Sequence, residues 1–148
     1  MRRFRRILHA TDFSTASAPA FAEALALARQ ERAELRLVHV MTPPALFLED
    51  SYLSARTFRE MQSRARRAVE DRLARLRARA RRAGVRAGAD VREGVPADEI
   101  IRAARRRRAD LIVVGTHGRS GFARAVLGSV AARVVTLARC PVLTVRGR

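Results

Sequence analysis

The sequence predicts an α/β protein with an open, five-stranded parallel sheet and helices on both of its faces. Short apolar runs typical of strands alternate along the chain with amphipathic helical patterns, as in a series of β-α-β crossovers. A glycine-marked turn follows one of these strands, and such turns are typical of anion sites. The length of 148 residues predicts one domain over residues 1–148, with no internal repeat.

The first part of the chain contains two predicted strands, one helix and a long connection. Residues 5–10 and 35–40 are apolar enough to form strands. A helix starts between them through Ser14–Pro19, because serine and an early proline both favour a helix start. Residues 41–57 are long for a loop, so we interpret them as a lid or as part of an interface.

A long helix is predicted over residues 58–83, followed by an edge strand and a third helix. Gly84 ends the long helix. Between residues 85 and 92, apolar and polar residues alternate, which predicts an edge strand with one solvated face. Pro96 starts the third helix, and Glu99 in its first turn favours the helix dipole. The apolar stripe of the long helix consists of Phe58, Met61, Ala65, Val69, Leu73, Leu76, Ala80 and Ala83.

The remaining elements are a central strand, a short helix and a last strand. Residues 111–114 form a continuous apolar run typical of a central strand, and residues 128–138 and 141–145 follow as helix and strand. Ligands of such sheets bind beyond the carboxyl ends of strands, where the strand order reverses. We therefore expect the ends of the first, second and fourth strands to meet in one crevice. These ends hold Ala10, Thr11, Asp12, Val40, Val114 and Gly115.

Glycines and a serine mark a predicted phosphate site. Gly115 and Gly118 follow the apolar strand, and Gly128-Ser129 comes after a further nine residues, at the start of a helix. Glycine lets backbone amides approach an anion, and a helix N-terminus adds free amides and the positive end of its dipole. The chain has no lysine, which excludes a Walker A loop. Any phosphate would therefore be bound by backbone amides and small hydroxyls.

Together these segments resemble the universal stress protein (UspA) family, in the subgroup that binds ATP. The glycine–serine spacing carries the resemblance, and residues 7–14, 37–40, 94–101 and 140–145 extend it over almost the whole chain. The resemblance implies a Rossmann-like, adenine nucleotide alpha hydrolase-like sheet with strand order 3-2-1-4-5. It further implies ATP as ligand, with Mg²⁺ held through the phosphates. It also implies a homodimer formed through residues 142–145, whose apolar edge needs covering.

The resemblance also assigns roles to single residues, each of which has a simpler alternative. Asp12 would bind the ribose, or else only cap the helix that follows. Val40 would contact the adenine, or else only pack in the core. The phosphates would be held by Gly115, Gly118, Gly128, Ser129 and Val130. The other candidates at the site are Ala10, Thr11, Val114, His117 and Arg119, of which His117 could equally be a solvated loop residue.

The histidines and the cysteine predict neither a metal site nor a disulfide. His9 and His39 lie in predicted strands, where we expect them to be buried with their hydrogen bonds satisfied. The three histidines of the chain do not have the spacing of zinc ligands. Cys140 is the only cysteine, so no internal disulfide can form, which fits a cytoplasmic protein.

The basic composition leaves two other functions open. The formal net charge is +17, which would attract nucleic acid or another polyanion. Aromatic residues are few and do not alternate with the arginines, so sequence-specific nucleic-acid binding is not expected. A slow ATPase or phosphotransferase would need a base near the terminal phosphate, and His117 is the candidate. The leading hypothesis is an ATP-dependent regulator in the stress response, in which ATP orders residues 116–124.

Overall fold

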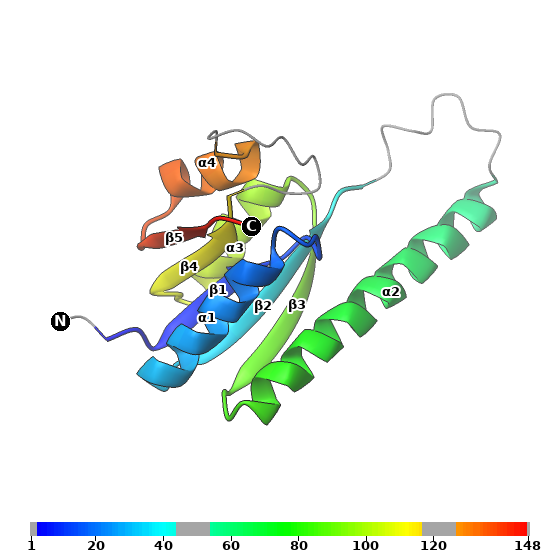
Figure 1. The fold of residues 1–148 in the computed structure, drawn as a ribbon. Coiled ribbons are helices and arrows are strands. Elements are labelled where there is room, and N and C mark those ends of the chain that lie inside the picture. The colour runs from blue at the N-terminus through cyan, green and yellow to red at the C-terminus, as the bar shows by residue number, and fades with distance from the viewer. Residues whose placement is uncertain (1–2, 44–53, 117–126, 148) are drawn as a thin grey trace.

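The protein forms a single parallel sheet covered by two pairs of helices. A computed structural model describes residues 3–43, 54–116 and 127–147. The five strands follow the order β3-β2-β1-β4-β5, which confirms the predicted order (Figure 1). Along the chain the elements are β1 (Arg6–Ala10), α1 (Ala18–Glu31), β2 (Glu34–Met41), α2 (Ala55–Arg82), β3 (Ala87–Glu93), α3 (Pro96–Arg106), β4 (Leu111–Gly115), α4 (Ser129–Leu137) and β5 (Val142–Val145).

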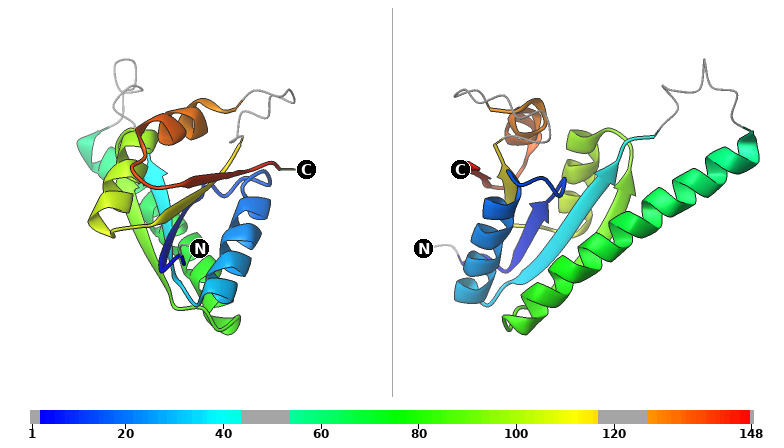
Figure 2. Two further views of the ribbon diagram at one scale, coloured as in Figure 1. Left: turned by 90° about the vertical axis from the view of Figure 1, so that its left-hand side faces the viewer. Right: turned by 45° about the vertical axis from the view of Figure 1, so that its right-hand side comes forward.

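Two separate apolar cores lie on the two faces of the sheet. The helices α1 and α2 cover one face, and α3 and α4 cover the other (Figure 2). In β1, Ile7 belongs to the first core and Leu8 to the second, and in β4 Val113 and Ile112 divide in the same way. Because successive side chains of a strand point to opposite faces, a strand buried on both faces must be apolar throughout. This explains why the central strands are continuous apolar runs.

The long helix α2 starts earlier than predicted and packs on the sheet over only part of its length. It begins at Ala55, not at residue 58, because the Ser54 hydroxyl accepts a hydrogen bond of 3.1 Å from the Thr57 amide. Residues 44–53 of the predicted connection lie outside the described part of the chain. Leu73 is buried in the first core, whereas Met61 is 55% exposed. The N-terminal half of α2 extends beyond the sheet (Figure 1).

Replacing Ser54 with alanine is expected to destabilise the start of α2 by about 1 kcal/mol, because the Thr57 amide then loses its partner. Since this half of the helix makes little contact with the sheet, the effect should be local. Amide hydrogen exchange should accelerate over the first turns of α2, while the melting temperature stays unchanged. A lower melting temperature of the variant would contradict the prediction that the effect is confined to the start of α2.

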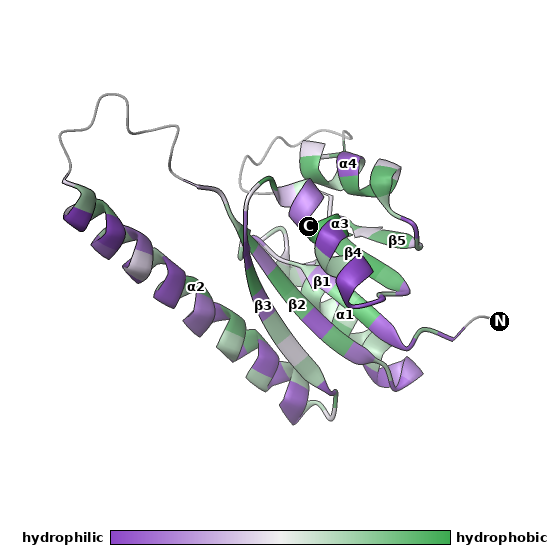
Figure 3. Ribbon diagram, turned by 180° about the vertical axis from the view of Figure 1, so that it is seen from behind, coloured by the Kyte–Doolittle hydropathy of each residue, from purple (hydrophilic) through white to green (hydrophobic). Residues whose placement is uncertain are grey.

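The two edges of the sheet are β3 and β5. The predicted edge strand is confirmed, although it spans Ala87–Glu93, and Val85 is buried just before it. From behind, β3 forms the margin of the sheet and α2 runs beside it (Figure 3). At the other edge, all four residues of β5 are half-buried. No helix in the described residues has the length and apolar character that crossing a membrane requires.

Candidate functional site

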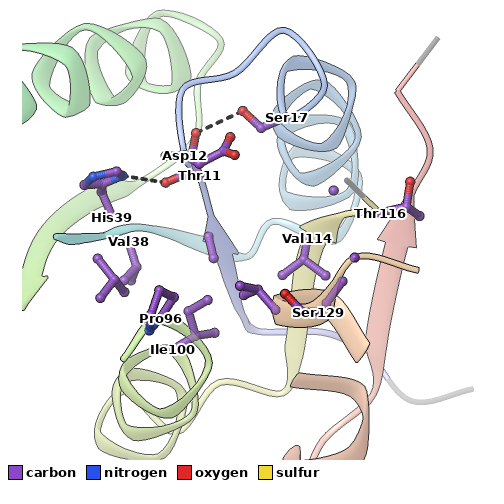
Figure 4. Close-up of a pocket in the computed structure, with 16 residues that line it drawn as sticks. Thr11, Asp12, Ser17, Val38, His39, Pro96, Ile100, Val114, Thr116 and Ser129 are labelled. Carbon is purple, nitrogen blue, oxygen red and sulfur yellow. Dashed lines mark hydrogen bonds between the residues drawn. The ribbon is translucent and has the colours of Figure 1, made fainter. Parts of the chain in front are cut away.

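A cavity of about 380 Å³ lies at the carboxyl ends of β1, β2 and β4, where the strand order reverses. In Figure 4, Pro96 and Ile100 lie beside Val38 on one side of the cavity, and Val114 and Ser129 lie on the other. Its size is within the range of small-molecule sites. The lining residues are Ala10, Thr11, Asp12, Ser17, Val38, His39, Val40, Pro96, Ile100, Val114, Gly115, Thr116, Gly128, Ser129, Val130 and Ala131.

The predicted site residues come together here wherever the structure describes them. Ala10, Thr11, Asp12, Val40, Val114, Gly115, Gly128, Ser129 and Val130 all line the cavity. His117, Gly118 and Arg119 lie outside the described residues. Pro96 and Ile100 were not predicted as lining residues, although the Gly-Val-Pro turn before α3 could have indicated them. Ser17 also lines the cavity, whereas the sequence indicates it only as part of a helix start.

A short turn after β1 places the Asp12 carboxylate at the cavity. Asp12 Oδ1 accepts hydrogen bonds from the Ser14 amide at 3.0 Å and from the Ser14 hydroxyl at 2.6 Å. Phe13 between them has a φ of 61°, a left-handed conformation that few non-glycine residues adopt. The N-cap of α1 is Ser17, so the alternative that Asp12 caps this helix is wrong. Asp12 instead closes its own turn and remains on the cavity wall.

His39 holds this turn from the opposite side. Its Nδ1 donates to the Thr11 carbonyl at 2.8 Å, and its ring stacks on Phe13 with the centroids 4.7 Å apart. The guanidinium of Arg72 in α2 lies over the Phe13 ring, 5.3 Å from its centroid. His39 is buried, as predicted. The stack over Phe13 fixes the strained turn and connects it to α2, which the sequence pattern did not indicate.

The backbone of Val40 faces the cavity because β1 ends before it. The Thr11 amide donates to the Val38 carbonyl at 2.9 Å, and this is the last backbone bond between the two segments. Backbone groups along a strand point alternately to its two neighbours, so those of Val40 point the same way as those of Val38. The amide and the carbonyl of Val40 therefore form a donor–acceptor pair beyond the end of β1.

The start of α4 provides amides on the opposite side of the cavity. The N-cap Gly128 has no side chain to bind them, and its own amide donates to the Thr116 carbonyl at 2.7 Å. The first intrahelical bond runs from the Ala132 amide to the Gly128 carbonyl. The amides of Ser129, Val130 and Ala131 therefore precede the helical bonding pattern. An uncapped helix N-terminus of this kind favours an anion.

Two buried ionisable residues, Glu99 and His9, directly precede the cavity-lining residues Ile100 and Ala10 in sequence. Glu99, 5% exposed, binds Arg92 at 2.8 Å and also pairs with Arg102. Burial alone would raise the pKa of the Glu99 carboxyl, but the hydrogen bonds from Arg92 and Arg102 hold it below its ordinary value.

His9 is fully buried, and burial lowers its pKa to about 4, against opposing effects of the Val113 carbonyl and Asp12. Its Nδ1 donates to the Val113 carbonyl at 3.1 Å, whereas Nε2 has no hydrogen-bond partner in the part of the chain that the structure describes. The expectation that its hydrogen bonds are satisfied is therefore wrong for Nε2. Within the described ranges, no cluster of three or more histidine, cysteine or acidic residues could hold a metal ion.

The fold and this cavity define a doubly wound α/β protein with a ligand-sized cavity at its switch point. The family model of the universal stress protein family matches residues 3–146. A universal stress protein of Methanocaldococcus jannaschii is 36% identical over 147 residues, covering 97% of this chain and 82% of its own. The chain belongs to the universal stress protein family.

Solved structures agree with this fold. A protein of Methanocaldococcus jannaschii superimposes with a TM-score of 0.86 at 24% identity, over 99% of both chains. A universal stress protein solved in complex with cAMP has a TM-score of 0.72 at 26% identity, over 99% of this chain and 100% of its own. The predicted family and fold are thus confirmed.

Proposed function

We propose that this universal stress protein binds ATP in the cavity and acts as a nucleotide-dependent regulator. One observation carries the proposal: the cavity has a strand-edge donor–acceptor pair at one end and an uncapped helix N-terminus at the other. The first suits a purine edge and the second suits phosphates. That a related protein was solved with cAMP supports an adenine nucleotide.

The adenine would lie against β2. The Val40 carbonyl would accept from the exocyclic amino group, and the Val40 amide would donate to the adjacent ring nitrogen. Val38, Pro96 and Ile100 provide apolar contacts for the ring faces. A guanine places a carbonyl where adenine has its amino group, so it would oppose the Val40 carbonyl. This pairing supports adenine over guanine as the base.

The ribose and the phosphates would follow from β1 towards α4. The Asp12 carboxylate would accept hydrogen bonds from the ribose hydroxyls. The amides of Ser129 and Val130 would donate to the phosphates, with Gly115 leaving room for a close approach. Gly118 remains a predicted member of this cradle. Mg²⁺ would be bound through the phosphates and would neutralise part of their charge.

Regulation would proceed by a population shift. A nucleotide that contacts β2, the Asp12 turn and α4 together favours the arrangement in which all three surround it. The Phe13 stack would pass this preference to α2.

A homodimer through β5 would present two such sites, and the exposed Val135 and Leu137 of the adjacent α4 support that interface. Sedimentation of a monomer at high protein concentration would contradict the dimer.

Replacing Ser129 with proline is expected to weaken ATP binding about 100-fold, because the variant loses one amide and one hydroxyl donor to a charged group. Ser129 is the first residue of α4, where proline is well tolerated, and Gly128 has a ψ of 151° that suits a following proline. The helix should therefore remain intact. Calorimetric titration with Mg-ATP measures the change, and circular dichroism confirms the helix.

Two controls make the result specific. Ser129→Ala keeps the amide and loses only the hydroxyl, so it should weaken binding about tenfold. Tripolyphosphate should not displace ATP from the unaltered protein, although the net charge of +17 attracts any polyphosphate. Equal affinities of the proline variant and the unaltered protein would show that ATP binds through surface charge and not at the start of α4.

A further inference from the structure

The outer edge of β3 carries backbone groups that face away from the sheet. The Leu35 amide donates to the Arg86 carbonyl, and the Gly94 amide donates to the Met41 carbonyl, so the backbones of Arg86 and Gly94 point towards β2. By alternation, those of residues 87, 89, 91 and 93 point outwards. The Arg81 guanidinium donates to the Ala87 carbonyl at 3.2 Å, which agrees with this direction. Ala89, Val91 and Glu93 therefore offer the remaining outward amides and carbonyls.

The surface along this edge is hollowed. A groove of about 490 Å³ is lined by Ala89–Arg92, by Arg66 of α2 and by Ala103 and Arg106 of α3. A second groove of about 710 Å³ meets it at Ala89 and follows the start of β3. Residues of β3 thus line both grooves, α2 contributes arginines to both, and α3 contributes to the first groove only. No described residue lines both a groove and the cavity at the switch point.

The walls of the two grooves are strongly basic. Of the residues that the structure describes, four arginines line each groove, namely Arg66, Arg92, Arg106 and Arg107 in one and Arg36, Arg77, Arg81 and Arg86 in the other. The carboxylates that line them are Glu34 and Asp90. Each already pairs with an arginine, Glu34 with Arg36 at 2.7 Å and Asp90 with Arg107 at 2.9 Å. Among the described residues, Arg77, Arg86 and Arg106 form no ion pair, so the grooves have unbalanced positive charge.

We propose that the outer edge of β3 binds an extended acidic segment of a partner protein, which adds to the sheet as a further strand. The outward amides and carbonyls of Ala89, Val91 and Glu93 would pair with its backbone. Its side chains would point alternately to α2 and α3, so acidic residues would meet arginines on both sides. The same arginines repel a second copy of this edge, which makes self-pairing unfavourable.

A peptide fits this edge better than a phosphate chain does. A strand satisfies amides and carbonyls alike, whereas phosphates accept hydrogen bonds only and would lie against the outward carbonyls of Ala89 and Val91. Among the described residues that line the grooves, none is an aromatic on which bases would stack. Charge would give the initial attraction, and the strand edge would provide the specificity.

The test uses a short fluorescein-labelled peptide, Glu-Glu-Val-Glu-Glu-Val-Glu-Glu, and fluorescence anisotropy at near-physiological salt. Val91→Pro removes an outward amide while leaving the pairing with β2 intact, and it should weaken binding about tenfold. Val91→Ala keeps the amide and should bind as the unaltered protein does. The same peptide N-methylated at every glutamate keeps its charge but cannot pair as a strand, so it should bind at least about tenfold more weakly to the unaltered protein.

Charge is tested separately with two variants of equal net charge. The double variant Arg66→Gln with Arg106→Gln removes one arginine from the α2 side and one from the α3 side of the first groove. It should weaken peptide binding about tenfold. Arg29→Gln with Arg105→Gln changes arginines outside both grooves and should weaken it less than about twofold.

Equal binding of the N-methylated and unmodified peptides would overturn strand addition, even if Val91→Pro failed to fold. Equal effects of the two arginine pairs would overturn the location. Oligothymidylate that competed fully with the peptide, and that bound the Val91→Pro variant unchanged, would assign the grooves to phosphate chains instead.

Discussion

Replacing Arg92 with methionine is expected to lower the free energy of unfolding by about 3 kcal/mol, because it leaves the Glu99 carboxylate buried with one partner fewer. Arg92 approaches Glu99 Oε2 with two nitrogens, at 3.0 Å and 2.8 Å. The Glu99 side chain is 7% exposed, so water cannot replace these hydrogen bonds. Urea denaturation at neutral pH measures the change.

Replacing Glu99, the other member of this pair, should lower the free energy of unfolding by less. Glu99→Gln keeps the shape of the side chain and removes its charge. Arg92 and Arg102 then lose their ion-pair partner, and their side chains are 23% and 67% exposed. Both guanidinium groups can reach water, so we expect a loss of only about 1 kcal/mol. A double variant of Arg92→Met and Glu99→Gln should be more stable than Arg92→Met alone. If Glu99→Gln lowered the free energy of unfolding more than Arg92→Met does, the buried carboxylate would not be the group whose missing partner causes the destabilisation.

The pH dependence provides an independent check on this cluster. The folded pKa of Glu99 lies below its ordinary value, so the cluster contributes stability above that value, and the contribution is lost as pH falls through the folded pKa. Without Arg92 the folded pKa should rise, and the acid-dependent loss should become smaller. The difference in stability between the two proteins should therefore narrow below about pH 4.5.

The elements that could be predicted from sequence are those set by local periodicity. The apolar run at residues 111–114 and the alternation before Gly94 both reflect side-chain directions along a strand, which depend on neighbours in sequence. The start of α2 was missed because the cap at Ser54 lies in a stretch without apolar periodicity. The exposure of Met61 was missed for another reason: a helical stripe does not reveal where the sheet beneath it ends.

The residues of the site also divide into those that local sequence patterns predict and those that depend on packing between distant elements. Asp12, Val40 and Ser129 could be predicted because strand ends and helix starts meet at a switch point in any doubly wound sheet. Pro96 and Ile100 reach the cavity only through the way α3 crosses the sheet. The sequence indicated Glu99 as a first-turn acid that favours the dipole, yet its main partner Arg92 comes from a strand. Such long-range pairs leave no periodic signal.

Replacing His9 with leucine is expected to remove about 3 kcal/mol of acid sensitivity from the protein. His9 is fully buried, with its pKa lowered to about 4 from an unfolded value of 6.5. The proton would go to Nε2, for which the described residues provide no hydrogen-bond acceptor. Leucine is of similar size and suits the apolar surroundings of this position, which include Phe21.

The direction in which the free energy of unfolding changes with pH follows from proton binding. Between pH 6.5 and about 4 the unfolded chain binds a proton at His9 that the folded protein does not bind, so stability falls as the pH is lowered. Each pH unit in this window costs about 1.4 kcal/mol, until both states are protonated. The difference in unfolding free energy between His9→Leu and the unaltered protein should thus shift by about 3 kcal/mol in favour of the variant from pH 7 to pH 4. Glu99 titrates in both proteins and cancels in this difference. A difference that stayed constant with pH, or a His9 ring resonance that titrated near pH 6.5, would show that the buried imidazole is protonated as easily as a free one.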